Sequence, residues 1–378
     1  MKPSILALFP IQPTINNYNH LLENFDIIYY TLTTRENFIN DIKSDKLNKI
    51  QAVFGSYPGF KSIGGLNDIE IINSLPNSLK IISLSSAGYD GYDLQLLKDK
   101  NIKLTNVPVD DYVAMDVADC ALWHVLSGIR KFNSFDNYIK SNTNDANTLI
   151  VRDQIRNVNI INDNKKHKGF AFGHVYHNNS ITRCSNKKCV IFGYGLIGKL
   201  VSQRMKTIGM DVNIVVRDKS KYVSHSDNND NDKLYSSNSK TELTNAVSNA
   251  NVIIICLPGG SHTENIINKE IFQLINDNSI IVNIGRGSCI NTEDLKDAIN
   301  SKKISHIGLD VFPNEPIIEN YWFNDQSINQ TSNNFYTSSI TPHLGSATLE
   351  TFEFATETSI SDIINVIEND TFNHVVNP

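Results

Sequence analysis

Cysteine is scarce and scattered in this chain of 378 residues. The five cysteines form no C-x-x-C pair, and no group of histidines has the spacing of metal ligands. Disulfide scaffolds and structural zinc sites depend on such patterns, so the sequence predicts neither a disulfide framework nor a metal site. We therefore expect a reduced, intracellular protein with a cytoplasmic location.

Long apolar runs and an excess of positive charge are also missing. No stretch approaches the roughly 20 consecutive apolar residues that a membrane-spanning helix needs. The first ten residues, MKPSILALFP, are too short for a signal peptide and better fit a β-strand. Lysine and arginine number 34 against 40 acidic residues, a formal net charge of −6, whereas a general nucleic-acid binder carries a basic excess. We expect neither a membrane nor a nucleic acid as partner.

Apolar residues make up 40% of the chain, in short runs that alternate with amphipathic segments. This alternation is typical of parallel β-sheets covered by helices, and the length favours two domains. One series of predicted strands comprises SILALF, QAVFG and LKIISLSSAG, and a helix is predicted over residues 111–131. A second series begins at KKCVIFG and continues through NIVV, ANVIIICLP, NSIIVNIG and HIGLDVF. Residues 225–240 and 320–339 are rich in polar residues, and we expect them to be solvated surface insertions.

A glycine motif follows the strand KKCVIF directly and opens a helix-like segment. Its glycines are Gly193, Gly195 and Gly198, in the order G-x-G-x-x-G. In a dinucleotide site the first glycine permits the tight turn, the second lets the backbone approach the pyrophosphate, and the third lets the helix pack closely. The amides at the start of the helix then face the phosphates. Glycines also serve ordinary turns, but the flanking strand and helix favour dinucleotide binding.

The end of the next strand bears on the choice of nucleotide. An acidic residue there would hold the ribose 2′-hydroxyl of NAD. This strand, NIVV, is followed instead by Arg217, with Asp218 after it. A guanidinium at this position suits the 2′-phosphate of NADP, so the sequence favours NADP over NAD. An ordinary exposed arginine is the alternative.

Three further segments follow the glycine motif along the chain: NIGRG at 283–287, GLDVFPNEP at 308–316 and TPHLGS at 341–346. Upstream of the glycine motif lie SAGYDGYD at 86–93 and NVP at 106–108. Together with that motif, these segments resemble the D-isomer-specific 2-hydroxyacid dehydrogenase family. The resemblance extends from Leu79 to Ser346, and several motifs in the same order are much more specific than any one of them.

The resemblance assigns the family's catalytic positions to Arg286, Glu315 and His343. Their chemistry is suited to 2-keto acid reduction. A guanidinium can bind the substrate carboxylate and polarise its carbonyl, a histidine can protonate the alkoxide, and a carboxylate favours the charged imidazole and orients it. Taken singly, these residues also fit a surface ion pair, a helix cap and a loop histidine. Each follows a predicted strand, which would bring all of them to the carboxyl edge of one sheet.

Other family positions carry over by the same resemblance. The turn that holds the substrate carboxylate corresponds to Ser86, Ala87 and Gly88, acting with Arg286; Ser86 stands where glycine is more usual. Cofactor-binding positions correspond to Gly193, Gly195, Leu196, Ile197, Gly198, Leu257, Pro258, Thr263, Ile284, Gly285, Arg286, Asp310, His343 and Gly345.

The resemblance implies an α/β fold with two Rossmann- or flavodoxin-like, doubly wound parallel-sheet domains and an active-site cleft between them. Residues 1–110 and 345–378 would form the substrate domain, and residues 111–344 the NAD(P)-binding domain. The expected activity is NAD(P)H-dependent reduction of small 2-keto acids, of the glyoxylate/hydroxypyruvate type, by a homodimer. The alternatives on the same fold are a nucleotide-sensing binding protein, similar to the corepressors of this group, and an inactive paralogue.

Overall fold

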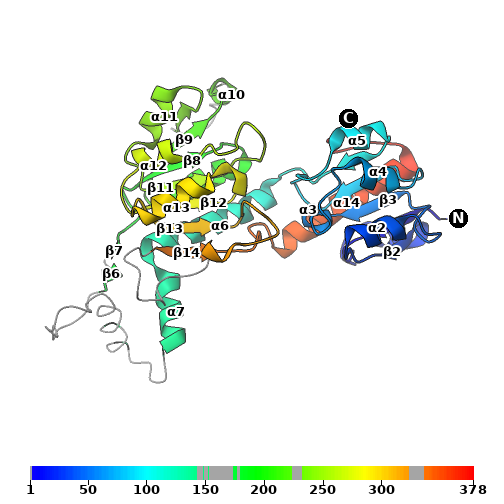
Figure 1. Ribbon diagram of the computed structural model, residues 1–378, viewed down its shortest axis with the longest axis horizontal. Helices are drawn as coiled ribbons and strands as arrows, with labels where there is room; N and C mark the ends of the chain where they lie inside the picture. Colours follow the sequence, from blue (N-terminus) through cyan, green and yellow to red (C-terminus); the bar gives the residue numbers. More distant parts are fainter. Residues whose placement is uncertain are drawn as a thin grey trace. The chain divides into compact units, whose positions relative to one another are not determined.

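The computed structural model describes residues 2–142, 148, 152, 173–176, 179–223, 232–322 and 336–378 (Figure 1). The chain divides into two compact units. Unit 1 comprises Met1–Val113 and Ala347–Pro378, and unit 2 comprises Ala114–Ser346. Within the described residues, no helix combines the length and the apolar character needed to cross a membrane.

Unit 1 is built on a five-stranded parallel sheet with the order β2-β1-β3-β4-β5. This is the strand order of flavodoxin-like folds. Every residue of β3 and β4 is buried, as expected for strands covered on both faces. The strands are β1 (Ser4–Ala7), β2 (Asp26–Tyr29), β3 (Ala52–Gly55), β4 (Ile81–Leu84) and β5 (Lys103–Thr105).

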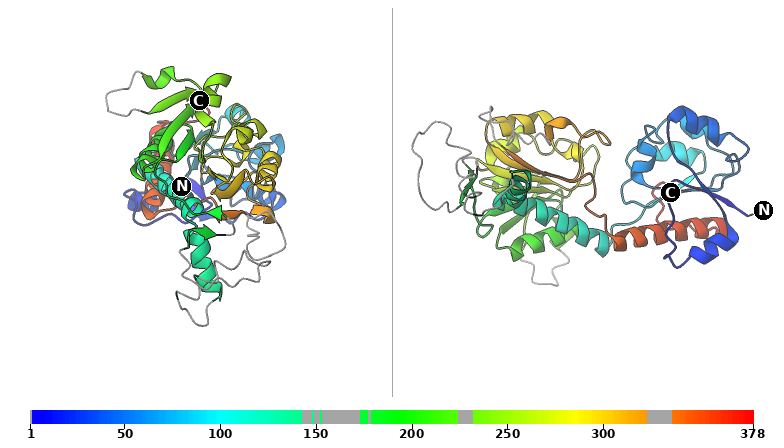
Figure 2. Two further views of the ribbon diagram at one scale, coloured as in Figure 1. Left: turned by 90° about the vertical axis from the view of Figure 1, so that its left-hand side faces the viewer. Right: turned by 90° about the horizontal axis from the view of Figure 1, so that it is seen from below.

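Helices cover both faces of this sheet. One face packs against α2 to α5, and the other packs against α1 and the carboxyl-terminal helix α14. Helix α14 contacts β3 and β4 and buries Ile360 and Ile363 completely, so the end of the chain completes the unit that its beginning starts (Figure 2). The helices are α1 (Tyr18–Asn24), α2 (Arg35–Ile42), α3 (Tyr57–Lys61), α4 (Ile69–Ser74), α5 (Leu94–Asp99) and α14 (Leu349–Asn369).

Unit 2 contains a seven-stranded parallel sheet with the order β10-β9-β8-β11-β12-β13-β14. The order reverses between β8 and β11, the point at which Rossmann folds bind dinucleotides. The strands are β8 (Lys188–Phe192), β9 (Asp211–Val216), β10 (Lys233–Ser236), β11 (Val252–Ile255), β12 (Ser279–Asn283), β13 (Ile304–Leu309) and β14 (Thr337–Ile340).

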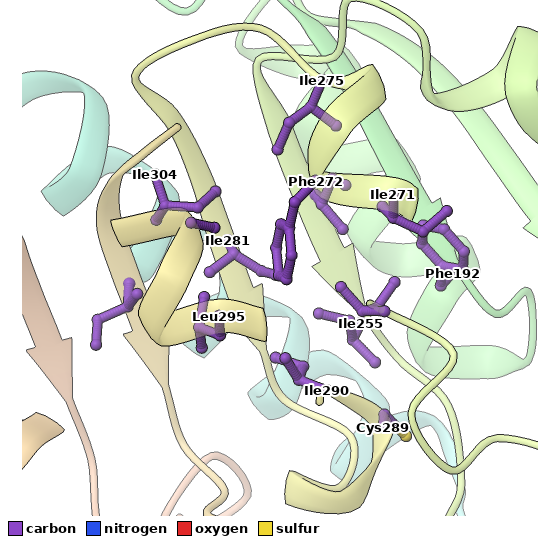
Figure 3. Close-up of a cluster of buried hydrophobic side chains, with 14 of the residues drawn as sticks. Phe192, Ile255, Ile271, Phe272, Ile275, Ile281, Cys289, Ile290, Leu295 and Ile304 are labelled. Carbon is purple, nitrogen blue, oxygen red and sulfur yellow. The ribbon is translucent and has the colours of Figure 1, made fainter. Parts of the chain in front are cut away.

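Alternate strand residues of unit 2 face opposite helical layers. Phe192, Ile255 and Ile281 point into an apolar core against α11, α12 and α13 (Figure 3). On the other face, α6 packs so closely on β13 that Gly128 lies against His306. The remaining elements are α6 (Asp111–Arg130), α7 (Phe132–Asn142), β6 (Val175–Tyr176), β7 (Asn179–Ser180), α9 (Leu196–Thr207), α10 (Ser220–Val223), α11 (Lys240–Val247), α12 (Lys269–Leu274), η1 (Gly287–Cys289), α13 (Thr292–Asn300) and η2 (Asn320–Trp322).

The predicted helix over residues 111–131 is confirmed as α6, whereas the expectation of solvated insertions is wrong in part. Lys233–Ser236 form the edge strand β10, and Lys240 begins helix α11. In the other stretch, Trp322 is 1% exposed and Thr337–Ile340 form β14. Each of these short segments has a sheet edge or a core to pack against, which composition alone does not reveal. Residues 225–231 of the first predicted insertion and residues 323–335 of the second lie outside the described residues.

Candidate active site

The glycine motif forms a tight strand-to-helix turn between β8 and α9. Gly193 has φ +105°, and a Cβ at this position would lie 2.7 Å from the carbonyl oxygen of Cys256. A Cβ on Gly198 would lie 2.2 Å from the carbonyl oxygen of Gly193, so only glycine lets the helix approach the strand this closely. Gly195, the N-cap of α9, has nothing within 4 Å of the place where a Cβ would stand. The turn therefore combines close packing with an open backbone surface at a helix amino terminus, which fits a pyrophosphate.

The loops after β8, β11 and β12 meet through their backbones at this edge of the sheet. A Cβ on Gly285 would lie 2.5 Å from the carbonyl oxygen of Leu257. Gly193 makes a similar close approach to the carbonyl oxygen of the neighbouring residue, Cys256. Thr263 closes the loop after β11 by donating from Oγ1 to the carbonyl oxygen of Pro258 at 2.7 Å. The residues that the family resemblance assigned to the cofactor thus lie on adjoining loops. Ile284 is buried beside them, and Leu196 is exposed in the first turn of α9.

A polar hollow of about 440 Å³ lies at the carboxyl end of β9. Asp218 accepts hydrogen bonds from the backbone N–H and the hydroxyl of Ser220, at 2.9 and 2.7 Å, which lower the pKa of its carboxyl group. Lys219 is paired with Glu242 at 2.6 Å. The hollow is lined by Arg217, Asp218, Lys219, Ser220, Lys221, Ser236 and Asn238. An arginine, two lysines and two serines among these residues can donate hydrogen bonds to a phosphate group.

The Arg286 turn follows β12 and is held by both ends of the Asn283 side chain. Asn283 Nδ2 donates to the carbonyl oxygen of Arg286 at 2.8 Å, and Asn283 Oδ1 accepts from the N–H of Gly285 at 3.1 Å. The next residue, Gly287, packs directly on the loop after β13, because a Cβ there would lie 2.1 Å from the carbonyl carbon of Phe312. The guanidinium of Arg286 also donates to the carbonyl oxygen of Gly285 at 2.9 Å.

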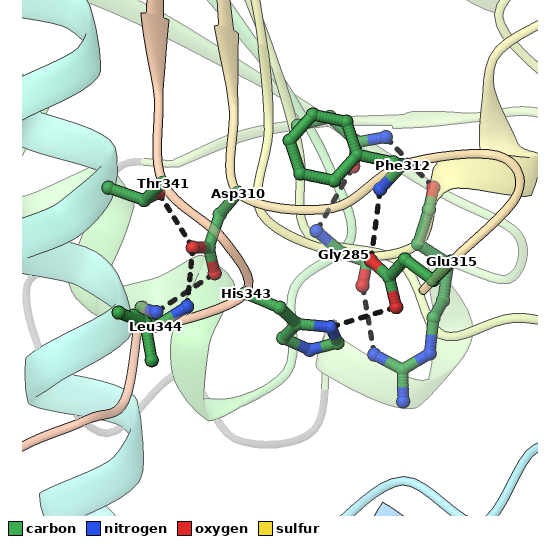
Figure 4. Close-up of polar contacts among 10 residues, drawn as sticks. Gly285, Asp310, Phe312, Glu315, Thr341, His343 and Leu344 are labelled. Carbon is green, nitrogen blue, oxygen red and sulfur yellow. Dashed lines mark hydrogen bonds and ion pairs between the residues drawn. The ribbon is translucent and has the colours of Figure 1, made fainter. Parts of the chain in front are cut away.

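Asp310 ties the loop after β14 to the end of β13. Its carboxylate is buried and accepts from Thr341 Oγ1 at 2.7 Å, from the N–H of Leu344 at 2.8 Å and from the N–H of Gly345 at 2.9 Å (Figure 4). A Cβ on Gly345 would lie 2.7 Å from Asp310 Oδ2, so the close approach requires glycine. These bonds fix the backbone on the carboxyl side of His343.

Glu315 and His343 form a direct pair. Glu315 Oε2 lies 3.0 Å from His343 Nδ1, and Glu315 Oε1 accepts from the N–H of Phe312 at 3.0 Å (Figure 4). The Glu315 side chain is 13% exposed and that of His343 is 37% exposed, so the imidazole is accessible while the carboxylate is enclosed. His343 has φ +56°, a left-handed conformation that histidine adopts uncommonly and that often marks functional loops.

The substrate turn predicted at Ser86, Ala87 and Gly88 lies in unit 1, after β4. It is an ordered turn: Ser86 Oγ donates to the carbonyl oxygen of Gly88 at 3.1 Å, and Asn106 Nδ2 donates to the carbonyl oxygen of Ala87 at 2.7 Å. The other predicted site residues all belong to unit 2. The predicted cleft between the domains stays a prediction.

Sequence reasoning missed a set of buried polar residues behind the site. His124 on α6 and His306 on β13 are at most 1% exposed, and both bond to Ser339 on β14. The available signal was the run of hydroxyl residues at positions 337–339, in which Thr337 and Ser339 lie on the same face of β14.

Cys120, Cys189 and Cys256 have the properties of unreactive, buried thiols. Burial raises the pKa of the thiols of Cys189 and Cys256 above their ordinary value and raises that of Cys120 to about 11, so these thiols stay protonated. Among the described residues, histidine, cysteine, aspartate and glutamate form no cluster of three that could hold a metal ion.

Comparisons with known proteins identify the family of the chain. Residues 148–345 match the family model described as D-isomer specific 2-hydroxyacid dehydrogenase, NAD binding domain. A Saccharomyces cerevisiae protein assigned by name to the 2-hydroxyacid dehydrogenases, YGL185C, is 34% identical over 98% of this chain and 95% of its own length. Glyoxylate reductase 1 of the same yeast is 26% identical over 89% of this chain and 83% of its own length.

A solved structure extends the agreement to the fold. The glyoxylate reductase from Paecilomyes thermophila superimposes with a TM-score of 0.73 at 22% sequence identity, covering 99% of this chain and 98% of that one. The predicted fold of two Rossmann-like, parallel-sheet α/β domains is therefore confirmed. On its sequence matches, the chain belongs to the D-isomer-specific 2-hydroxyacid dehydrogenase family, whose members are oxidoreductases that use a nicotinamide cofactor.

Proposed function

We propose that this protein is an NAD(P)H-dependent reductase of small 2-keto acids, of the glyoxylate/hydroxypyruvate type. The observation that carries the proposal is the Glu315–His343 pair, in which Glu315 belongs to the loop after β13 that packs against the Arg286 turn, and His343 to the loop after β14. The similarity to yeast glyoxylate reductase 1 supports the substrate class. The proposal assigns the cofactor to unit 2 and the substrate carboxylate to the Ser86–Gly88 turn of unit 1.

Each catalytic side chain has a definite task in this mechanism. The Arg286 guanidinium binds the keto-acid carboxylate through parallel hydrogen bonds and polarises the adjacent carbonyl. Glu315 engages His343 Nδ1, so Nε2 is the atom that gives its proton to the alkoxide. The ionised carboxylate stabilises the imidazolium before that transfer. The nicotinamide, when bound, supplies the hydride, and the protein supplies placement and charge.

The test is oxidation of NADPH or NADH by the purified full-length chain, with glyoxylate, hydroxypyruvate and the bulkier phenylpyruvate. We expect His343→Ala to lower kcat by about 10²-fold or more, the usual contribution of a general acid. Arg286→Lys keeps the charge but loses the planar fork, and should mainly raise KM for the keto acid. A matched control is His20→Ala, which breaks a surface His–Glu pair of the same 3.0 Å length, with Glu368.

The outcomes separate the alternatives. Turnover that is lost in the Arg286 and His343 variants and kept in His20→Ala supports the reductase. Tight nucleotide binding without turnover would contradict it and favour the nucleotide-sensing protein. Faster turnover of phenylpyruvate than of glyoxylate would overturn the assignment to small substrates alone.

A preference for NADPH is part of the proposal, because the hollow at the end of β9 gathers Arg217 with lysine and serine side chains. Arg217→Gln should raise KM for NADPH about tenfold, the effect of one charge-assisted bond of about 1.5 kcal/mol, and leave KM for NADH nearly unchanged. Asp218→Asn removes a negative charge from the hollow and should favour NADPH further. A suitable control is Lys233→Gln, on the edge strand β10. Equal losses with both cofactors in Arg217→Gln would contradict the preference.

We also propose a cytoplasmic homodimer. The five cysteines form no disulfide with one another, a pattern typical of reducing compartments. Helices α6 and α7 expose large apolar side chains of the kind that interfaces cover, namely Met115, Trp123, Phe132 and Ile139. Sedimentation velocity tests the dimer: Phe132→Asp with Ile139→Asp should give monomers, whereas Leu349→Asp, at an exposed leucine of α14, should not. A monomeric wild-type chain would refute this assembly.

A further inference from the structure

A row of buried polar groups runs behind the candidate site, between helix α6 and strands β13 and β14. It begins at Lys131 Nζ, which lies 2.7 Å from Thr337 Oγ1, and continues to His306 Nδ1, 2.7 Å from the same oxygen. Ser339 Oγ then lies 3.0 Å from His306 Nε2 and 2.7 Å from His124 Nδ1.

The row reaches the candidate site through Thr341. His124 Nε2 lies 3.4 Å from Thr341 Oγ1, which in turn lies 2.7 Å from Asp310 Oδ1. Asp310 binds the amides of the residues that follow His343. A continuous series of side-chain contacts thus joins a buried lysine to the loop that carries His343.

The two ends dictate the direction of every hydrogen bond. A lysine ammonium only donates, so Thr337 accepts from Lys131. The Thr337 hydroxyl proton then has two acceptors within reach, His306 Nδ1 at 2.7 Å and the carbonyl oxygen of Ser305 at 3.5 Å, and the shorter contact makes His306 Nδ1 its acceptor. His306 must then carry its proton on Nε2 and donate to Ser339. Ser339 donates to His124 Nδ1 in the same way, so His124 also carries its proton on Nε2. Thr341 accepts from it and donates to the Asp310 carboxylate, which only accepts.

The surrounding backbone is shaped to admit these two rings. A Cβ on Gly308 of β13 would lie 2.7 Å from His124 Cβ, and a Cβ on Gly128 of α6 would lie 2.6 Å from His306 Cδ2. Each histidine therefore fits against a glycine of the facing element. Burial lowers the pKa of His124 to about 3 and, together with the nearby Lys131 charge, lowers that of His306 well below its ordinary value. Both rings stay neutral, as the directed bonds require.

We infer that His124, His306 and Ser339 are positioning residues, which hold Asp310, and through it the His343 loop, by a directed hydrogen-bond chain that starts at Lys131. The chain carries a positive group at one end and a negative group at the other, so each bond polarises the next in the same sense. Its effect on catalysis rests on the proposed function, whereas its geometry does not.

The structural test uses full-length protein with ¹⁵N-labelled histidine. Long-range ¹H–¹⁵N spectra distinguish the two neutral tautomers, and His124→Gln and His306→Gln assign the two rings. Ser339→Ala interrupts the chain, and its matched control is Ser279→Ala, which removes an equally buried hydroxyl from β12 of the same sheet. We expect the Nε2–H tautomer in both rings, shifted signals of both rings in Ser339→Ala, and unchanged signals in Ser279→Ala.

Two further readouts report on the loop. Hydrogen exchange at the amides of Leu344 and Gly345 should speed up in Ser339→Ala and not in Ser279→Ala. Turnover at saturating keto acid and NADPH should fall about tenfold in Ser339→Ala, because small displacements of a catalytic group cost that much or more. Thr341→Val should behave likewise, whereas Thr341→Ser, which keeps the hydroxyl, should retain most of the activity.

An Nδ1–H tautomer in either ring would overturn the inference, as would loop exchange or turnover that changes equally in Ser339→Ala and Ser279→Ala. If the wild-type chain reduces no keto acid, the proposed function fails. The tautomers and the loop exchange then decide on the chain by themselves.

Discussion

At the residue scale, the glycine motif separates a structural glycine from a binding glycine. A Cβ on Gly198 would lie 2.2 Å from the carbonyl oxygen of Gly193, whereas a Cβ on Gly195 would meet nothing within 4 Å. Gly198→Ala should therefore lower the free energy of unfolding by about 1–3 kcal/mol, the usual cost of overpacking. Gly195→Ala should leave that free energy within about 0.5 kcal/mol and weaken NADPH binding, because the methyl group fills the surface that the pyrophosphate would approach.

Urea unfolding and fluorescence titration with NADPH measure the two effects on the same proteins. The reverse pattern, with a destabilised Gly195→Ala and a stable Gly198→Ala, would contradict the division of roles.

Glu315 gives a second prediction at the same scale, because its two oxygens have different partners. Glu315→Gln keeps an acceptor for the N–H of Phe312 but removes the charge beside His343. We expect kcat to fall at least tenfold, since the imidazolium loses its counter-charge, with little loss of stability. Glu315→Ala should lower both, because it leaves the Phe312 amide without this partner. Equal activity of Glu315→Gln and wild type would show that the carboxylate charge has no catalytic role.

The positions of these residues were predictable from the sequence for a physical reason. Arg286, Glu315 and His343 each follow a strand of one parallel sheet, so the fold carries them to the same edge. His124 and His306 escaped prediction because each looks like a single polar residue in an apolar segment. Only the packing of α6 on β13, where glycines make room for both rings, reveals that they share partners.

At the element scale, the packing of α6 on β13 makes stability depend on pH. His124 has a pKa of about 3 in the folded protein, against about 6.5 in an unfolded chain. Below pH 6.5 the unfolded state therefore binds a proton that the folded state does not, so the free energy of unfolding falls as the pH falls. The slope is about 1.4 kcal/mol per pH unit for one such group, down to about pH 3. Above pH 6.5 the ring is neutral in both states and contributes no pH dependence.

His124→Gln tests this directly. Urea unfolding of the variant between pH 7 and pH 4 should give a curve that is less steep than that of wild type by about one proton. His20→Ala, at an exposed histidine of unit 1, should run parallel to wild type. Parallel curves for His124→Gln and wild type would mean that the ring is protonated in the folded protein.

Element boundaries show where sequence patterns reach their limit. The central strands are continuous apolar runs, which identify them as buried from the sequence alone. Strand β10 and the segment around Trp322 lie within or beside polar stretches, and neither forms a long apolar run of its own. Edge strands need less apolar surface than central ones, so a polar composition predicts a loop where an edge strand forms.

At the scale of the whole molecule, the chain crosses between two hydrophobic cores, and the last helix returns to the first core. Helix α14 inserts Ile360, Ile363 and Val366 beside strands that lie more than 250 residues earlier. Such a discontinuous unit cannot be read from local periodicity, because the pattern of α14 indicates an amphipathic helix but not its partner. The family resemblance supplied that expectation, and the contacts of α14 with β3 and β4 agree with it.

Two separate cores predict two separately measurable stabilities. Ile363 of α14 and Ile307 of β13 are both fully buried, one in each unit. Replacing either by alanine should lower the free energy of unfolding by about 2–5 kcal/mol, and hydrogen exchange should show each loss only in the unit that contains the substitution.

NADPH at about 100 times its Kd should add about 2.7 kcal/mol to the stability of the unit that binds it. If the cofactor binds unit 2, NADPH should offset the loss of stability that Ile307→Ala causes in that unit. It should leave the amide hydrogen exchange of β3 and β4 in Ile363→Ala largely unchanged. Uniform loss of protection across both units in either variant would instead show that the two cores unfold as one.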